Sequence, residues 1–242
     1  MSEQFTITKR PGWGAAITVT IECDPLATMG VKLGLAVRVA RNARADLTGA
    51  DLAGAYLTRA NFAGADLTRA DLTGADLAGA NLAGADLTRA DLTGADLTGA
   101  DLAGAYLTGA YLTGADLAGA DLTRAYLTGA YLTGADLTGA IIRGDKITRL
   151  IAVAQRPTPG DQYTFFAFEL EAGGVKIHAG CRWFTIPEFR AHVADQYPNT
   201  DKADDTLEIL DYIERRALRV GAIKPDEPAP KKPRAKAAKV AA

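Results

Sequence analysis

The residues with the clearest potential for covalent chemistry lie in one short segment, KIHAGCRWF, where His178 precedes Cys181 by three positions. A second histidine, His192, follows in the next part of the chain. An imidazole in contact with a thiol can lower the thiol pKa and produce a thiolate nucleophile. No phosphate-binding loop or pair of catalytic carboxylates accompanies these residues, however, and Gly180 and Trp183 are turn and core residue types. We therefore predict that Cys181 is structural and that the chain is not an enzyme. A thiol enzyme is the least favoured alternative.

Metal chemistry and disulfide chemistry have little support. The two cysteines, Cys23 and Cys181, are far apart in the sequence, and the chain contains only two histidines. This set fits neither a disulfide framework nor a zinc site with paired ligands. We predict no structural metal and no cofactor.

Charge is distributed unevenly along the chain. The net charge is -2, but residues 1–44, 45–144, 145–223 and 224–242 carry net charges of +3, -7, -2 and +4. An acidic centre between basic ends predicts a basic partner for the centre.

The acidic centre is a strict repeat. Alanine recurs at every fifth position from Ala45 to Ala140, and leucine follows two positions later in nearly every unit. An α-helix would spread leucine around all its sides, and a simple strand would alternate faces from unit to unit. Each unit must therefore contain a bend. Alanine and leucine would point inward, the residue between them outward, and the small fourth and fifth residues would form the corner.

Units such as ADLTG, ANLAG and AYLTG resemble the A(D/N)Lxx signature of pentapeptide repeat proteins, over 100 of the 242 residues. The resemblance implies a mainly β fold, a right-handed, four-sided (quadrilateral) parallel β-helix. Four units would form a coil, so the twenty units would give about five coils. At roughly 4.8 Å per coil the solenoid would be about 24 Å long.

Sorting the outward residues by side gives the candidate site. Aspartates occupy the first two sides near the N-terminal end, and tyrosines continue the same sides toward the C-terminal end. The predicted partner-binding residues are Asp46, Asp51, Asp66, Asp71, Asp86, Asp91, Tyr106, Tyr111, Tyr126 and Tyr131. Stacked like charges repel unless water, cations or a basic partner screens them. Two alternatives remain open: the aspartates are simply family consensus, and the tyrosines stack on one another.

A further resemblance suggests a more specific function. Some pentapeptide repeat proteins are known as DNA mimics that occupy the DNA-binding surface of DNA gyrase. Duplex DNA would carry roughly 14 charges over about 24 Å, twice the net charge of -7 of this repeat. The repeat also lacks the loop insertions of some of those inhibitors. DNA mimicry against gyrase or a phage-host target is therefore the alternative function.

The flanking segments are expected to cap the repeat. We predict two N-terminal strands and a capping helix within residues 1–44, a small α+β module over 145–223 and a disordered basic tail over 224–242. The elements expected are strands at 5–8, 15–22, 147–155, 163–170 and 175–179, a turn at 157–160, and helices at 28–43, 185–194 and 202–220. The segments VKLGLAVRVARNARADL and AGCRWFT resemble flanks of pentapeptide repeat proteins carried by phages and prophages.

The sequence contains no apolar run long enough to span a membrane and no signal peptide at its start, so we expect a cytoplasmic protein with no membrane partner. The basic tail is expected to contact nucleic acid only weakly, because it has no aromatic residue to stack on bases. The function predicted first is a non-enzymatic interaction or scaffold protein that presents an acidic surface to a protein partner, in one alternative a basic DNA-binding protein. A homodimer is also left open.

Overall fold

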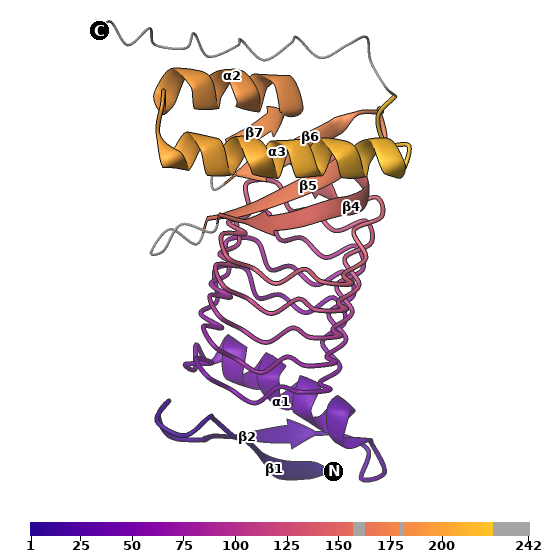
Figure 1. Ribbon diagram of the computed structural model, residues 1–242. Coiled ribbons are helices and arrows are strands. Elements are labelled where there is room, and N and C mark those ends of the chain that lie inside the picture. The colour runs from indigo at the N-terminus through magenta and orange to yellow at the C-terminus, as the bar shows by residue number, and fades with distance from the viewer. Residues whose placement is uncertain (157–162, 180–181, 225–242) are drawn as a thin grey trace, which may run out of the picture.

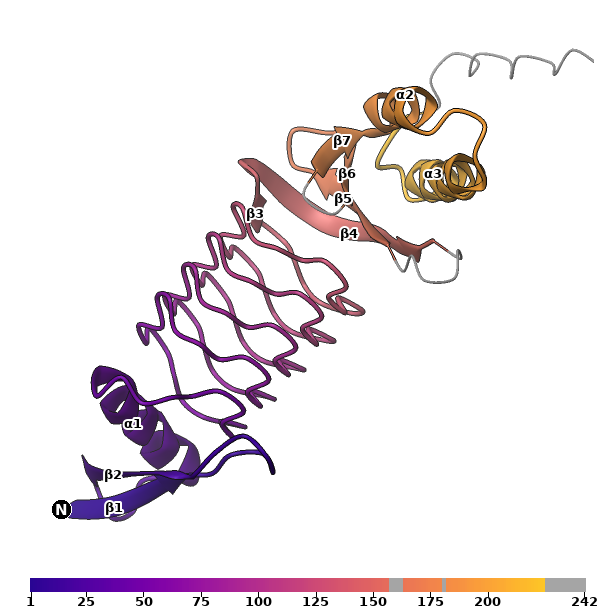
Figure 2. The ribbon, with the colours of Figure 1, turned by 90° about the vertical axis from the view of Figure 1, so that its left-hand side faces the viewer.

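A ladder of parallel backbone pairs forms the middle of the molecule, between two end structures (Figures 1 and 2). The structure is a computed structural model and describes residues 1–156, 163–179 and 182–224. Its parallel bridges join residues twenty positions apart, from Asp51 and Asp71 to Asp121 and Ile141. One coil therefore contains four repeat units, and the predicted β-helix is confirmed.

Each repeat unit ends in a tight turn. In the first unit the Ala50 N–H donates to the Leu47 carbonyl at 3.0 Å, and later units repeat this bond. The fifth residue of the unit has a positive φ, for example +67° at Gly109. A positive φ at the third position of a turn is typical of type II turns and favours glycine. The fixed spacing of glycine therefore bends the chain once per unit.

The interior of the coil is filled by stacked leucine and alanine side chains. Leu92, Leu72 and Leu112 are fully buried, and they belong to one column together with Leu52 and Leu132. The predicted burial of this column is confirmed. A single coil encloses too little apolar surface to fold alone, so its stability depends on the coils above and below it.

The N-terminal end is closed by two strands and a helix. Strands β1 (Ser2–Ile7) and β2 (Ile17–Glu22) pair antiparallel, and helix α1 (Met29–Asn42) lies across the first coil. Two helical glycines allow this close approach, because a Cβ at Gly34 would lie only 2.1 Å from the Tyr56 carbonyl oxygen. The predicted helix and both strands are confirmed, although β1 begins earlier than predicted.

The C-terminal end is closed by an antiparallel sheet in the order β3-β4-β5-β6-β7. These strands are β3 (Ile141–Ile142), β4 (Asp145–Gln155), β5 (Thr164–Leu170), β6 (Val175–Ala179) and β7 (Arg182–Thr185). The three strands predicted in this region are confirmed. Strands β3 and β7 were not predicted, because β3 has only two residues and β7 has only four and runs directly into the next helix. The turn predicted at 157–160 lies outside the described residues.

Two helices cover the sheet on the side away from the coils (Figures 1 and 2). Helix α2 (Ile186–Gln196) begins at the predicted capping box of Thr185 and Glu188, and helix α3 (Asp201–Arg219) follows. Phe166 and Phe168 of β5 join the core of the coils, while Phe165 joins the core under the helices. The sheet therefore continues the hydrophobic core of the β-helix. Among the described residues, no helix has the length and apolar character needed to cross a bilayer.

Candidate partner-binding surface

The outward aspartates have a structural role in the turns. In most units that carry one, the Oδ1 atom accepts a hydrogen bond from the backbone N–H two residues later, as between Asp66 and Thr68 at 2.9 Å. Asn61 and Asn81 accept the equivalent bond at 3.0 and 3.1 Å. Such Asx turns stabilise a local bend without requiring a charge. The fold therefore explains an Asp or Asn at this position, but it does not explain the charge.

Two of the six aspartates predicted to bind a partner are paired within the chain. Lys9 contacts Asp46 at 2.9 Å and Arg10 contacts Asp71 at 3.2 Å, both from the segment between β1 and β2. Hydrogen bonds from Thr48, together with Lys9, lower the pKa of Asp46 to about 2. These two carboxylates are ionised at neutral pH, but part of their charge is already neutralised.

The other predicted aspartates follow the same two columns. Asp66 and Asp86 form one parallel bridge, and Asp71 and Asp91 form another in the neighbouring column. Asp51, in the column of Asp71, accepts a hydrogen bond from the Thr8 hydroxyl at 3.3 Å. The structure therefore brings the predicted aspartates together in two adjacent columns.

The four predicted tyrosines lie in the same two columns, in two stacked pairs. The ring centroids of Tyr106 and Tyr126 are 4.8 Å apart with planes 3° from parallel. Those of Tyr111 and Tyr131 are 4.9 Å apart with planes at 4°. The alternative in which the tyrosines stack on one another is thus confirmed, yet the four residues remain 45–48% exposed. Stacking aligns the rings and leaves a large aromatic surface in contact with solvent.

The chain between neighbouring tyrosines consists of small or buried residues. In both coils the residues between the two tyrosine columns are Leu, Thr, Gly and Ala. The Arg89 side chain of the preceding coil lies close to Gly109, between the two columns. Tyr106 bridges to Asp86 and Tyr111 bridges to Asp91, which places a carboxylate beside each aromatic pair. We name Tyr106, Tyr111, Tyr126 and Tyr131 the tyrosine surface.

A second group of carboxylates was not among the predicted site residues. It consists of Asp76, Asp96, Asp116 and Asp136 in one column and Asp101 and Asp121 in the next. None of these six forms an ion pair with any residue in the described part of the chain. The signal was present in the sequence, because the spacing that aligns the predicted aspartates also aligns these residues, but our prediction took only the two columns that contain tyrosine pairs.

The residues considered for catalysis do not converge in the described part of the protein. His178 is buried on β6, close to Trp183 and Phe166, and burial lowers its pKa to about 4. His192 stacks on Phe184, which packs in the core beneath the helices. Because Trp183 and Phe184 project from opposite faces of β7, the two imidazoles lie on opposite faces of the sheet. Cys181 lies outside the described residues.

A metal site is equally unsupported, since the described residues contain no group of three or more potential His, Cys, Asp or Glu ligands.

The family model for pentapeptide repeats matches residues 43–79, 70–109 and 105–144. The chain belongs to the pentapeptide repeat family. Comparison with curated proteins finds no match to it. The resemblance of the flanks to phage-borne members stays a prediction, because the family match covers only the repeats.

Several solved pentapeptide repeat structures are similar to this family member. HetL, involved in heterocyst differentiation regulation in the cyanobacterium Nostoc sp. strain PCC 7120, is 40% identical over 43% of this chain and 56% of its own, with a TM-score of 0.35. Another pentapeptide repeat protein from Nostoc PCC 7120 is 35% identical over 50% of this chain and 86% of its own, with a TM-score of 0.18. QnrB1, a plasmid-mediated fluoroquinolone resistance protein, is 23% identical over 37% and 59%, with a TM-score of 0.26. The chain thus spans little more than half the length of HetL.

Proposed function

We propose that this pentapeptide repeat protein is a non-enzymatic interaction or scaffold protein that acts in the cytoplasm and presents a rigid acidic surface to a protein partner. In this proposal the β-helix is the right-handed, four-sided coil of about five turns that the family resemblance implies. The tyrosine surface is the main contact area, and the aspartate columns beside it orient the partner.

The exposure of the stacked tyrosines is the observation that supports this proposal. Tyr106, Tyr111, Tyr126 and Tyr131 keep nearly half of their surface in solvent although stacking has already ordered their rings. Exposed tyrosine clusters are over-represented at interface hot spots because they bury a large area with few rotatable bonds. Aspartate occupies the same columns in earlier coils, so the fold itself does not require tyrosine there.

This exchange within the columns also provides a test that preserves the fold. Replacing all four tyrosines with Asp restores the residue found at Asp86 and Asp91 and allows the same Asx turn to form. We expect that affinity capture from the native host retains one partner with the unaltered protein and loses it with the four-Asp variant. Tyr56→Asp is the matched control. Tyr56 lies against helix α1 and does not belong to the tyrosine surface, so this change should leave the capture of the partner unaltered. Equal capture by all three proteins would refute the role of the tyrosine surface.

DNA mimicry is the second candidate function. It is supported by the two adjacent columns of aspartate, in which charges repeat at each coil. It is weakened at the N-terminal end, where Lys9 and Arg10 neutralise two of the six carboxylates. The partner in this case is a basic DNA-binding protein, gyrase-like or another target of a phage in its host.

DNA mimicry by the aspartates and partner binding by the tyrosine surface predict different responses of binding to mutation and to salt. Replacing Asp46, Asp51, Asp66, Asp71, Asp86 and Asp91 with Asn should keep the coil, because Asn61 and Asn81 already make the same turn bonds. Mimicry predicts that this six-Asn variant loses the partner, that binding weakens steeply with added salt, and that duplex DNA competes. Full retention by the six-Asn variant, or binding that is independent of salt, would exclude mimicry.

A further inference from the structure

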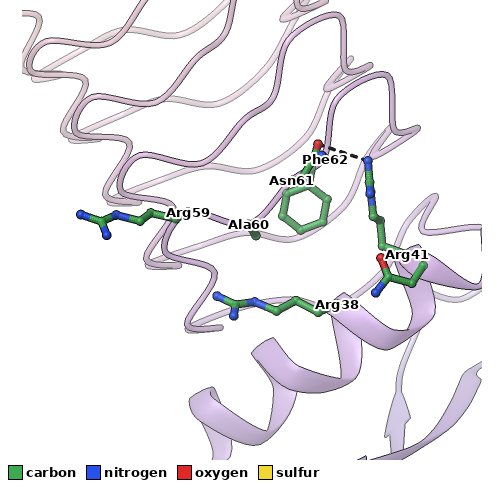
Figure 3. Close-up of a pocket in the computed structure, with 7 residues that line it drawn as sticks. Arg38, Arg41, Arg59, Ala60, Asn61 and Phe62 are labelled. Carbon is green, nitrogen blue, oxygen red and sulfur yellow. Dashed lines mark hydrogen bonds between the residues drawn. The ribbon is translucent and has the colours of Figure 1, made fainter.

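A pocket lies where the C-terminal half of α1 meets the first coil of the β-helix (Figure 3). Its volume is about 220 Å³, and its polar lining comes from Arg38, Arg41 and Asn42 of the helix and from Arg59 and Asn61 of the coil. Figure 3 shows Arg38 and Arg59 extending toward the same side, while Arg41 bends toward Asn61.

The pocket is strongly basic although the β-helix around it is acidic. Three arginines line it, and neither aspartate nor glutamate does. Among the described residues, none of the three arginines forms an ion pair. Each guanidinium carries five N–H donors. Arg38 donates to the Thr58 carbonyl at 2.9 Å and Arg41 to the Asn61 side chain at 3.2 Å, which leaves most of these donors available.

Three residues that differ from the commonest residues of the repeat line this pocket. Arg59 replaces the glycine of most other units and is held at a φ of +55°, a backbone conformation that disfavours residues with a side chain. Asn61 replaces an aspartate and so removes a negative charge. Phe62 is the only residue other than leucine at its position between Leu47 and Leu137. The coil would fold with the usual Gly, Asp and Leu, so its turns do not explain this combination.

The edge of the coil adds a backbone donor. In the next coil the Asn81 N–H donates to the Ala60 carbonyl at 2.9 Å, toward the N-terminal end of the β-helix. The equivalent N–H of Asn61 therefore faces α1. Within residues 1–156, 163–179 and 182–224 it donates no hydrogen bond. A neutral N–H donor thus belongs to a residue that lines the pocket.

We propose that this pocket binds a phosphate group. Arginine forks match the oxygens of a phosphate, and unpaired arginines with free donors favour an oxyanion over a neutral ligand. The volume is below the range typical for whole drug-sized ligands, so the pocket encloses the anionic group and leaves the rest of its carrier outside. A neighbouring pocket is lined by Asp46 and Asp66. Their carboxylates repel an anion, so the anion site does not extend into this second pocket. The inference does not depend on the proposed interaction role.

Calorimetric titration of the full chain at constant ionic strength tests this assignment. The probes are inorganic phosphate and phenyl phosphate, with chloride as the background anion. We expect saturable binding with one site per chain. Arg59→Gly, which restores the usual residue of the repeat and relieves the positive φ, should weaken binding by about tenfold or more.

The matched control is Arg124→Gly, the same change at the same position of a distant unit that also has a positive φ, +61°. Arg124→Gly should change the affinity for phosphate by no more than about twofold, because the charge of Arg124 lies farther from the pocket than the Debye length. Tighter binding of phenyl phosphate than of inorganic phosphate would identify a phosphomonoester as the ligand, and equal binding would identify free phosphate. The absence of saturable binding, or equal weakening by both variants, would overturn the proposal.

Discussion

Truncation of Leu92 to alanine tests how the β-helix is held together. The Leu92 side chain is fully buried, and the side chains above and below it in the column, Leu72 and Leu112, are also fully buried. Large-to-small changes of this kind cost about 2.7–5 kcal/mol, and the cost rises with the volume of the cavity that remains. Here the coils are held at a fixed spacing by backbone bonds such as that from the Leu92 N–H to the Tyr111 carbonyl, 2.7 Å long. They cannot collapse into the cavity, so we expect a loss of about 4 kcal/mol.

Urea denaturation followed by circular dichroism measures this loss directly. Thr93→Ala is the matched control, because it lies in the same unit, faces outward and should change stability by no more than about 0.5 kcal/mol. Leu92→Asp should unfold the coils altogether, since an unpaired carboxylate buried in this column costs several kcal/mol more by rough estimate. If Leu92→Ala lowered the free energy of unfolding by less than about 1 kcal/mol, the stacked-column account of the core would be wrong.

Two further substitutions and one labelling experiment test individual residues. Hydrogen bonds from Thr48 together with Lys9 lower the pKa of Asp46 from 3.8 to about 2, so its carboxylate stabilises the fold above about pH 4 and loses this contribution as the pH falls toward 2. In a Lys9→Met variant this acid-dependent loss should be smaller, as measured by urea denaturation between pH 4 and pH 2. Gly114→Ala should cost about 1 kcal/mol in thermal unfolding, because φ is +67° while no neighbouring atom obstructs the new Cβ. Native Cys181 should react with alkylating reagents far more slowly than a free thiol, and rapid alkylation would revive the thiol-enzyme hypothesis.

The interior of the β-helix could be predicted from sequence because its constraint is local and repeated. A period of five excludes both a straight helix and a straight strand, and the position of leucine in the unit identifies the buried side chain. The same argument placed Tyr106 next to Tyr126 and Tyr111 next to Tyr131, although the sequence could not show whether those rings would remain exposed after stacking.

The contacts that escaped prediction join segments distant in the sequence and outside the repeat. Lys9 reaches Asp46 across 37 positions, from a loop whose course no periodicity specifies. Phe166 and Phe168 belong to β5, and only the three-dimensional path of the sheet shows that they close the core of the coils. The phosphate pocket depends on the angle at which α1 crosses the first coil, and that angle is determined by Gly30 and Gly34 packing against Tyr56.

Within a repeat this regular, the residues of the consensus and the departures from it carry different information. Each Ala, Leu and Gly has a position that the coil requires, and each Asp or Asn closes a turn, so none of them alone identifies a function. A departure replaces a residue that the fold favours. Tyr106 and Tyr111 give up the turn bond made by Asp86 and Asp91, and Arg59 accepts a backbone conformation suited to glycine. Stacking within each tyrosine pair offsets part of the lost turn bond, but it leaves the rings exposed. A contact outside the coil is therefore the most direct physical reason for keeping these exchanges.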